Sequence, residues 1–172
     1  MCSAFPTPLY SHVGRGDFRD VYEPAQDSFL LIDALEKDAE RLQRMRLVSE
    51  LLLVSMFSCT DVNPAAAGCT ATTASCNSVS LQPVLTDLVG GRGIEASWAG
   101  GERGREVTDR FLPAAAQLLS QRGLFYLVTI AENHPEEIVE LLGQRGLEGE
   151  LCSSTRAGNE RLSVLRFSRR QT

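Results

Sequence analysis

The apolar run at residues 51–59 constrains the fold more than any other segment of this chain. An uninterrupted run of this length is typical of a strand buried on both faces, as parallel sheets require. It is followed at once by Asp61, then by Asn63 and Pro64. Asn63 as N-cap and Pro64 at the first helical position predict a helix that extends to Cys76. A buried strand that leads directly into a helix is the repeating unit of α/β domains.

The remaining segments continue this alternation. Residues 1–20 predict an irregular arm, and Asp27 or Ser28 is expected to cap a helix that reaches Leu42. Further strands are predicted at 79–85, 124–130, 147–152 and 162–167, helices at 105–121 and 136–144, and a loop at 94–104. The last two strands are expected to form an antiparallel hairpin on the sheet edge. The pattern predicts an α/β fold with a doubly wound, Rossmann-like sheet, helices on both faces, and one domain over residues 21–172.

Charge and cysteine content exclude several classes of protein. Seventeen basic and 22 acidic residues give a net charge of -5, which argues against direct nucleic-acid binding. The five cysteines form no CxxC pair, so neither a metal site nor a disulfide framework is expected, and three of them (Cys59, Cys69, Cys76) are predicted to be small buried residues. No apolar run has transmembrane length, and the start of the chain has no signal-peptide pattern. The expected compartment is intracellular, with no membrane partner.

Two aspartates stand where a ligand of such a sheet would bind. Asp61 and Asp87 each follow a predicted strand, and ligands of doubly wound sheets lie at the carboxyl ends of the strands. An acidic residue after the second strand of a dinucleotide site accepts hydrogen bonds from ribose hydroxyls. The alternative is that Asp61 is only the turn residue before a capped helix. The glycine-rich turn that normally accompanies such a site is absent, since the sequence has no GxGxxG and no Walker pattern.

Several short segments occur in an order that carries more information than any one of them. They are Val-Gly-Arg-Gly at 13–16, Val-Tyr-Glu-Pro-Ala-Gln-Asp-Ser-Phe-Leu-Leu at 21–31, Thr-Asp-Val-Asn-Pro-Ala-Ala at 60–66, Thr-Asp-Leu-Val at 86–89, Gly-Ile-Glu-Ala-Ser-Trp-Ala-Gly-Gly at 93–101, Gly-Arg-Glu-Val at 104–107 and Gly-Leu-Phe-Tyr-Leu-Val-Thr at 123–129. Together they resemble the eukaryotic HemK-type release-factor glutamine methyltransferases over nearly the whole chain.

The resemblance implies a class I methyltransferase fold and the cofactor S-adenosylmethionine. It implies methylation of a glutamine side-chain amide in a Gly-Gly-Gln sequence of a translation termination factor, and methylation of a histone lysine has also been ascribed to the family. It also implies a heterodimer with a small zinc-binding activator subunit that covers an apolar sheet edge, in the cytoplasm and also the nucleus. Asp61 would bind the cofactor ribose, Asp87 and Leu88 would flank its adenine, and Ser28 would lie near its methionine end, where the family usually has threonine.

Two family motifs are missing. An acidic residue followed by Gly-x-Gly-x-Gly should precede Asp61, but only residues 48–57 occupy that interval, and no glycine follows Glu50. The Asn-Pro-Pro-Tyr motif of the fourth strand, which holds the substrate amide, should lie between Leu88 and Gly93. Both gaps look like excised segments, as a splice variant or a faulty gene model would produce. We therefore expect a shortened family member that lacks part of its central sheet and has no catalytic residue. Its activity is expected to be impaired. The alternative is a non-catalytic module that binds the activator subunit or the substrate factor.

Overall fold

A computed structural model describes residues 7–13, 20–51, 57–86 and 105–170. The chain divides into two compact units, and each is described by itself. The first unit comprises Met1–Glu23 and Arg46–Ala99, and the second comprises Pro24–Met45 and Gly100–Thr172. Among the described residues, no helix is long and apolar enough to cross a bilayer. The expectation of one domain over residues 21–172 stays a prediction, and the loop predicted at 94–104 lies outside the described residues.

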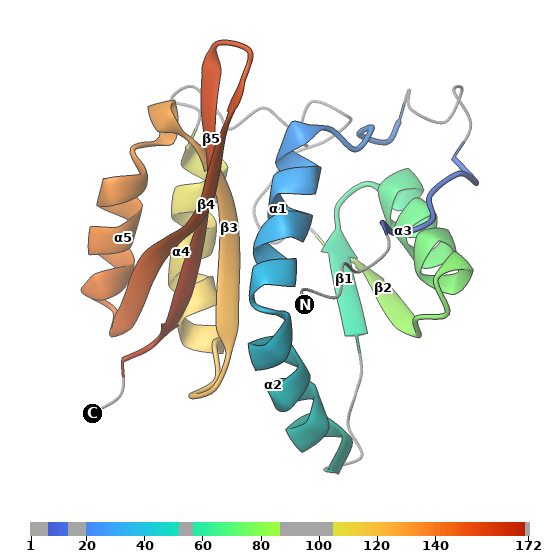
Figure 1. The fold of residues 1–172 in the computed structure, drawn as a ribbon, viewed down its shortest axis with the longest axis horizontal. Coiled ribbons are helices and arrows are strands. Elements are labelled where there is room, and N and C mark those ends of the chain that lie inside the picture. The colour runs from blue at the N-terminus through green and yellow to red at the C-terminus, as the bar shows by residue number, and fades with distance from the viewer. Residues whose placement is uncertain (1–6, 14–19, 52–56, 87–104, 171–172) are drawn as a thin grey trace. The chain divides into compact units, whose positions relative to one another are not determined.

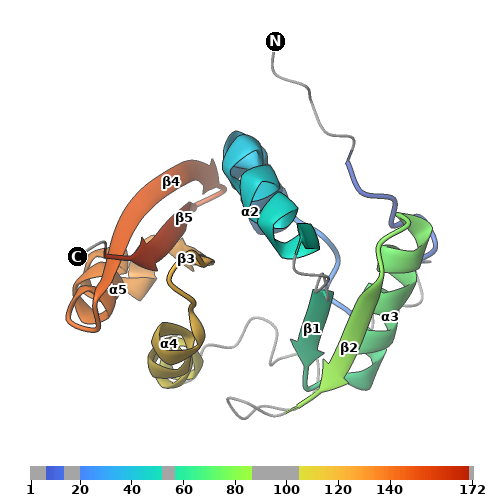
Figure 2. The same cartoon turned by 90° about the horizontal axis from the view of Figure 1, so that it is seen from below.

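The first unit is a strand–helix–strand arrangement. Strands β1 (Phe57–Asp61) and β2 (Leu81–Leu85) pair in parallel, and helix α3 (Pro64–Cys76) connects them (Figure 2). Asn63 is the N-cap of α3, and its side-chain oxygen accepts the N–H of Ala65 at 2.9 Å. Pro64 occupies the first turn, where its missing N–H has no helical partner to lose. The helix predicted from Asn63 and Pro64 is therefore confirmed.

The strand predicted at 51–59 is displaced in the structure. Leu51 ends helix α2 (Ala39–Leu51), and the strand is β1, which includes Asp61. Burial on both faces was wrong, because Phe57 is 50% exposed and Leu85 of the neighbouring strand is 59% exposed. In the described part of the chain β1 has β2 as its single strand neighbour. A two-stranded sheet covered by one helix cannot enclose both of its faces.

The cysteines of the first unit were also expected to be buried, and they are not. Cys76 is exposed, and Cys59 and Cys69 are partly exposed. The cause is the same as for Phe57, since a layer of one helix over two strands has little interior. Among the described residues of this unit, the buried apolar ones are Ala67 and Ala74.

The second unit is a three-layered α/β/α arrangement. Its sheet has the order β3-β5-β4, with all pairs antiparallel, and it comprises β3 (Leu124–Ile130), β4 (Leu147–Ala157) and β5 (Glu160–Arg169). Helix α1 (Gln26–Lys37) covers one face, and α4 (Glu106–Leu118) and α5 (Pro135–Gly143) cover the other (Figure 1). A short 3-10 helix, Ala131–Asn133, leads from β3 into α5. The predicted strand at 124–130 and the C-terminal hairpin are confirmed, but of the two hairpin strands only β4 lies at a sheet edge, because β5 lies between β3 and β4.

Strand alternation builds a separate apolar core on each face of this sheet. Leu127 pairs with Leu165 and faces α4 and α5, whereas the next pair, Val128 with Val164, faces α1. The first core is completed by fully buried residues of both helices and the sheet: Leu112, Ile138, Leu142, Leu147 and Phe167. Burying such a side chain stabilises a fold by about 1.5–3 kcal/mol. Helices thus cover both faces of the sheet in this unit, as predicted.

The N-terminal helix was predicted with the wrong cap and the wrong length. Its N-cap is Ala25, and Ser28 lies one turn further on, where its hydroxyl accepts the N–H of Ala25 at 3.4 Å. The helix ends at Lys37 and a second begins at Ala39, so it does not extend through Leu42. The interruption falls at Asp38.

Asp38 is held by two side chains of the sheet. Its carboxylate accepts the hydroxyl of Tyr126 at 2.6 Å and pairs with the guanidinium of Arg166. Arg166 also donates from Nε to Glu150 on β4 at 3.0 Å. Asp38 and Arg166 are 15% and 14% exposed, so solvent screens their attraction only partly. This cluster joins the end of α1 to all three strands of the sheet.

Neutralising Asp38 is expected to weaken the second unit in a pH-dependent way. Burial alone would raise the pKa of Asp38, but hydrogen bonds from Arg166 and Tyr126 and the charge of Arg166 together hold it below 3.8. A lowered pKa contributes stability that is complete above pH 3.8 and is lost as the pH falls through the folded-state value. We expect Asp38→Asn to lower the free energy of unfolding by about 1.5–3 kcal/mol at pH 7. Urea denaturation followed by circular dichroism measures the difference.

The same comparison below pH 3.8 should show the two proteins converging. The matched control is Asp33→Asn, an exposed carboxylate on helix α1, which should change the free energy of unfolding by less than about 0.5 kcal/mol. An equal loss for both variants would contradict a specific role for the Asp38 cluster.

Gly149 on β4 is expected to tolerate no side chain. A Cβ at this position would lie 2.4 Å from Cε1 of Phe167, whose ring is fully buried and stacks on Phe125 with centroids 5.8 Å apart. Gly149→Ala must therefore displace the ring or the strand, and we expect it to lower the free energy of unfolding by about 1–3 kcal/mol. Gly143→Ala, where a Cβ would meet no atom within 4 Å, should leave stability unchanged or raise it by up to about 1 kcal/mol. Thermal melts of both variants test the contrast.

Candidate functional site

Asp61 is the last residue of β1, and its carboxylate is engaged in a turn. Its Oδ1 accepts the N–H of Asn63 at 2.8 Å, and its backbone oxygen accepts the N–H of Thr86 at 3.0 Å. The register places Asp61 opposite Leu85, so β1 and β2 end side by side. The carboxyl ends of two parallel strands thus coincide, which is where doubly wound sheets bind their ligands.

The turn and the ribose interpretations of Asp61 are compatible. The turn uses Oδ1, and no described residue donates a hydrogen bond to Oδ2. A ribose hydroxyl needs a single acceptor oxygen of this kind, and Asp61 is only partly buried. The turn role is observed directly, whereas the ribose contact stays a prediction.

The other predicted site residues are distributed differently. Asp87 and Leu88 lie outside the described residues. Ser28 belongs to the second unit, in the first turn of α1, where its N–H donates to Asp27 at 2.8 Å. Asp61 belongs to the first unit, so each of these two side chains is described only within its own surroundings.

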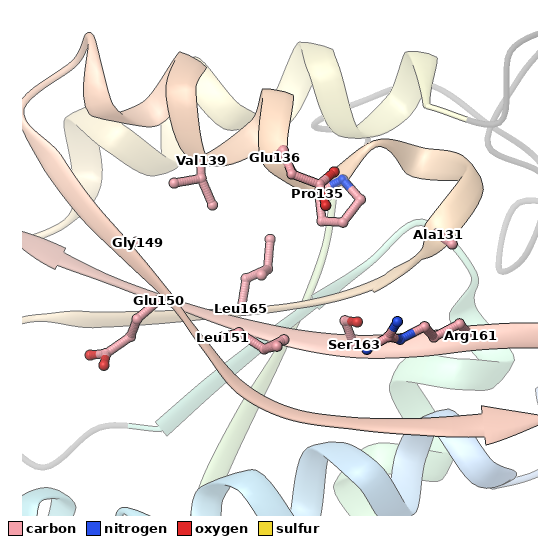
Figure 3. Close-up of a pocket in the computed structure, with 10 residues that line it drawn as sticks. All are labelled: Ala131, Pro135, Glu136, Val139, Gly149, Glu150, Leu151, Arg161, Ser163 and Leu165. Atoms are coloured by element: carbon pink, nitrogen blue, oxygen red, sulfur yellow. The ribbon is translucent and has the colours of Figure 1, made fainter.

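A cavity of about 320 Å³ lies wholly within the second unit, between α5 and the strands β4 and β5 (Figure 3). Its lining is mainly apolar, with Leu165 and Val139 among the walls and the buried hydroxyl of Ser163 beside them. Glu136 and Arg161 add one charge of each sign. The sequence did not point to the lining residues, because they come from four elements (the 3-10 helix, α5, β4 and β5) and no motif joins them.

The cavity offers no arrangement for group transfer. None of its ten lining residues is a histidine or cysteine, and neither Glu136 nor Glu150 is hydrogen bonded to the hydroxyl of Ser163. A nucleophile needs an adjacent base to be activated. In the described part of the chain no group of three or more histidine, cysteine, aspartate or glutamate residues could hold a metal ion. The aligned strand ends at Asp61 therefore remain the candidate site.

Comparison with known proteins identifies the family. No protein-family model matches the chain. A mouse protein named methyltransferase HEMK2 is 50% identical over 95% of this chain and 97% of its own length, and the human protein of that name is 47% identical over 96% and 97%. This chain belongs to the HEMK2 methyltransferase family. A fission-yeast relative, named as the catalytic subunit mtq2 of an eRF1 methyltransferase, is 29% identical over 95% of both chains.

Solved structures confirm the fold. The Mtq2–Trm112 complex of E. cuniculi, described as methylating the eRF1 translation termination factor, aligns with a TM-score of 0.54 at 20% identity, over 88% of this chain and 99% of that one. A methyltransferase of Pyrococcus furiosus gives 0.50 at 18% identity, over 73% and 69%. The resemblance to HemK-type methyltransferases and the Rossmann-like methyltransferase fold are therefore both confirmed.

The alignments also bear on the missing motifs. The alignment with the mouse relative spans 207 positions, whereas this chain has 172 residues. The difference, 207 less 172, means that at least 35 aligned positions hold a residue of the relative and none of this chain. An excess of this size accommodates the glycine-rich turn and the Asn-Pro-Pro-Tyr strand that the sequence lacks.

The observed strand pairing agrees with the removal of two central strands from a doubly wound sheet. In a doubly wound sheet of order 3-2-1-4-5, strands 1 and 4 are neighbours in the middle. The two missing motifs belong to those two strands, and their removal would leave strands 3 and 2 as one pair and strand 5 with its followers as another group. The described strands form this division, with β1-β2 as a parallel pair and β3-β5-β4 as a separate sheet.

The residues present fit S-adenosylmethionine only in part. Asp61 lies at the aligned strand ends, its Oδ2 accepts no hydrogen bond from the described residues, and it therefore suits a ribose. The opposite wall, where backbone N–H groups of a glycine-rich turn approach the ligand, has no counterpart in the sequence. The cofactor pocket is therefore incomplete, and no reaction step is derived through it.

The turn role of Asp61 can be separated from its charge. Asp61→Asn keeps a side-chain oxygen that can accept the N–H of Asn63, so we expect its stability to stay within about 0.5 kcal/mol of the parent. Asp61→Ala removes the acceptor and should cost about 0.5–1.5 kcal/mol. Hydrogen exchange at the start of α3, together with urea denaturation, measures both. Equal behaviour of the two variants would show that the turn contributes nothing.

Proposed function

We propose that this chain descends from an S-adenosylmethionine-dependent methyltransferase of a termination-factor glutamine, and that methyl transfer by the chain itself is strongly impaired. The family membership and the eRF1 activity named for the yeast relative support the ancestral reaction. The observation that carries the impairment is the division into two sheets, together with the absence of the two motifs that strands 1 and 4 would bear.

The chemistry of the ancestral reaction explains why these losses are severe. The amide nitrogen of glutamine attacks the sulfonium methyl carbon, the sulfur–carbon bond breaks, the sulfur leaves with both bonding electrons, and the nitrogen loses a proton. An amide nitrogen is a poor nucleophile, so the rate depends on groups that hold it in line with the methyl carbon. Losing one preorganised polar contact typically slows an enzyme about 10²–10³-fold. This chain lacks the whole motif that would supply such contacts.

A second function is supported by the exposed edge strand of the first unit. β2 is an edge strand of the described sheet, and it exposes Val84 and Leu85 (39% and 59%). An apolar sheet edge is the kind of surface that the family's activator subunit covers, and the Mtq2 structure was solved with Trm112. The chain would then act as a non-catalytic interaction module that binds the activator subunit or the termination factor.

Co-expression with a Trm112-type subunit tests both functions at once. We expect the two proteins to co-purify, and we expect transfer of labelled methyl to a Gly-Gly-Gln-bearing termination factor to be at least about 100-fold slower than with the human relative. The human relative prepared in the same way is the positive control, and a termination factor with Gln→Ala in that motif is the negative control. A histone is included as a second substrate, because the family resemblance does not separate glutamine from lysine.

Isothermal titration with S-adenosylmethionine separates loss of the cofactor site from loss of the substrate site. We expect no heat of binding at any protein concentration that the solubility of the chain allows. Micromolar binding would contradict the incomplete pocket. Transfer at the rate of the human relative would overturn the impairment.

A further inference from the structure

One edge strand of each described sheet, β4 in one and β2 in the other, is protected against pairing with other chains. Edge β4 carries Glu148, Glu150 and Arg156 and has a register shift between Leu151 and Ser153. Edge β2 contains Pro83, which has no N–H to donate. Charges, bulges and proline are the devices by which natural sheets keep their edges from pairing.

Strand β3 has none of these devices. Its seven residues, Leu-Phe-Tyr-Leu-Val-Thr-Ile, are all uncharged and include neither proline nor glycine. Only one side of β3, the one that faces β5, is paired among the described strands. Successive backbone groups of a strand point to opposite sides, so the other side presents the donors and acceptors of every second residue, in a sequence suited to the interior of a sheet.

The family comparison explains how an interior strand came to lie at an edge. In the doubly wound order the neighbour of β3 would be strand 4, which bears the missing Asn-Pro-Pro-Tyr motif. The 207 aligned positions against 172 residues show that relatives have segments that this chain lacks. In this chain β2 and β4 carry such protection, and β3 carries none.

We propose that β3 is a self-association site, at which a second copy of this chain adds its own β3 in antiparallel orientation about Leu127. This pairing sets Leu127 against Leu127, Tyr126 against Val128, Phe125 against Thr129 and Leu124 against Ile130. No charge meets a like charge, because the strand has no charge. Like charges directly opposite one another would disfavour the pair, and aromatic and branched pairs favour it.

The pairing also continues both cores. Directly opposed residues of an antiparallel pair lie on the same face. Phe125 and Leu127 face the core of α4 and α5, and Tyr126 and Val128 face the core of α1. A second copy would therefore extend each face with residues of the same kind and give a six-stranded sheet. β1 is a poorer partner, since it has five residues, three of them polar or acidic (Ser58, Thr60, Asp61).

Sedimentation of the full-length chain over a range of concentrations tests the proposal. A monomer–dimer equilibrium is expected, with growth stopping at the dimer, because a two-fold pair of one edge closes on itself. A chain that stays monomeric at all concentrations, or one that grows beyond the dimer without limit, overturns the proposal.

Two proline variants show whether β3 is the site. Successive N–H groups of an antiparallel strand point to opposite sides, so of Leu127→Pro and Val128→Pro one removes a hydrogen bond to β5 and the other removes only the outward N–H. The variant that keeps a cooperative melt is expected to be monomeric. A folded proline variant that still dimerises overturns the proposal.

Hydrogen exchange of the unaltered chain gives a second readout that needs no folded variant. Peptides that cover Leu124–Ile130 should exchange more slowly as the dimer fraction rises, whereas peptides of the other edge, Leu147–Ala157, should not change. Dimerisation with protection at β4 instead would place the interface elsewhere. These measurements do not depend on cofactor binding or methyl transfer.

Discussion

Backbone pairing between strands is the constraint on which the rest of this structure depends. A strand in the interior of a sheet satisfies its N–H and C=O groups with a neighbour on each side, whereas an edge strand leaves half of them to solvent or to another chain. Among the described residues, β1 and β3 each pair on one side only. Both are the strands that would flank the centre of a doubly wound sheet. Removal of two central strands would thus take pairing from two others as well.

The two units differ in how many strands, covering helices and buried apolar residues stabilise them. The second unit has a sheet of three strands covered on both faces, and the Asp38–Arg166 pair joins its N-terminal helix to that sheet. The first unit has two strands and one helix, and its buried apolar residues in the described part of the chain are Ala67 and Ala74. Two alanines contribute little to a core when each buried methylene is worth about 0.8 kcal/mol. The candidate cofactor residue Asp61 therefore lies in the less stable part of the molecule.

Local signals predicted the elements well, and long-range contacts account for the failures. The strand Leu124–Ile130 and the start of α3 at Asn63 and Pro64 follow from residues that are adjacent in sequence. The break after Lys37 could not be predicted, because it coincides with an ion pair to Arg166, 128 residues away. The exposure of Phe57 was unpredictable for a related reason: an apolar strand implies a neighbour on each side, and β1 has one neighbour among the described strands. The site was predicted in part, since the turn at Asp61 is local but a ribose contact needs a second wall.

Family membership and catalytic competence reside in different parts of such a sheet. The mouse and human relatives that show the family align with at least 95% of this chain, although each alignment has more positions than the chain has residues. The chemistry depends on the two central strands, whose glycine-rich turn and amide-binding motif meet at the point where the strand order reverses. A deletion confined to the centre therefore leaves most of the sequence similarity intact while removing the walls between which cofactor and substrate would meet. Asp61 keeps its place at the end of β1 and its turn to Asn63, so it records the ancestry of the fold.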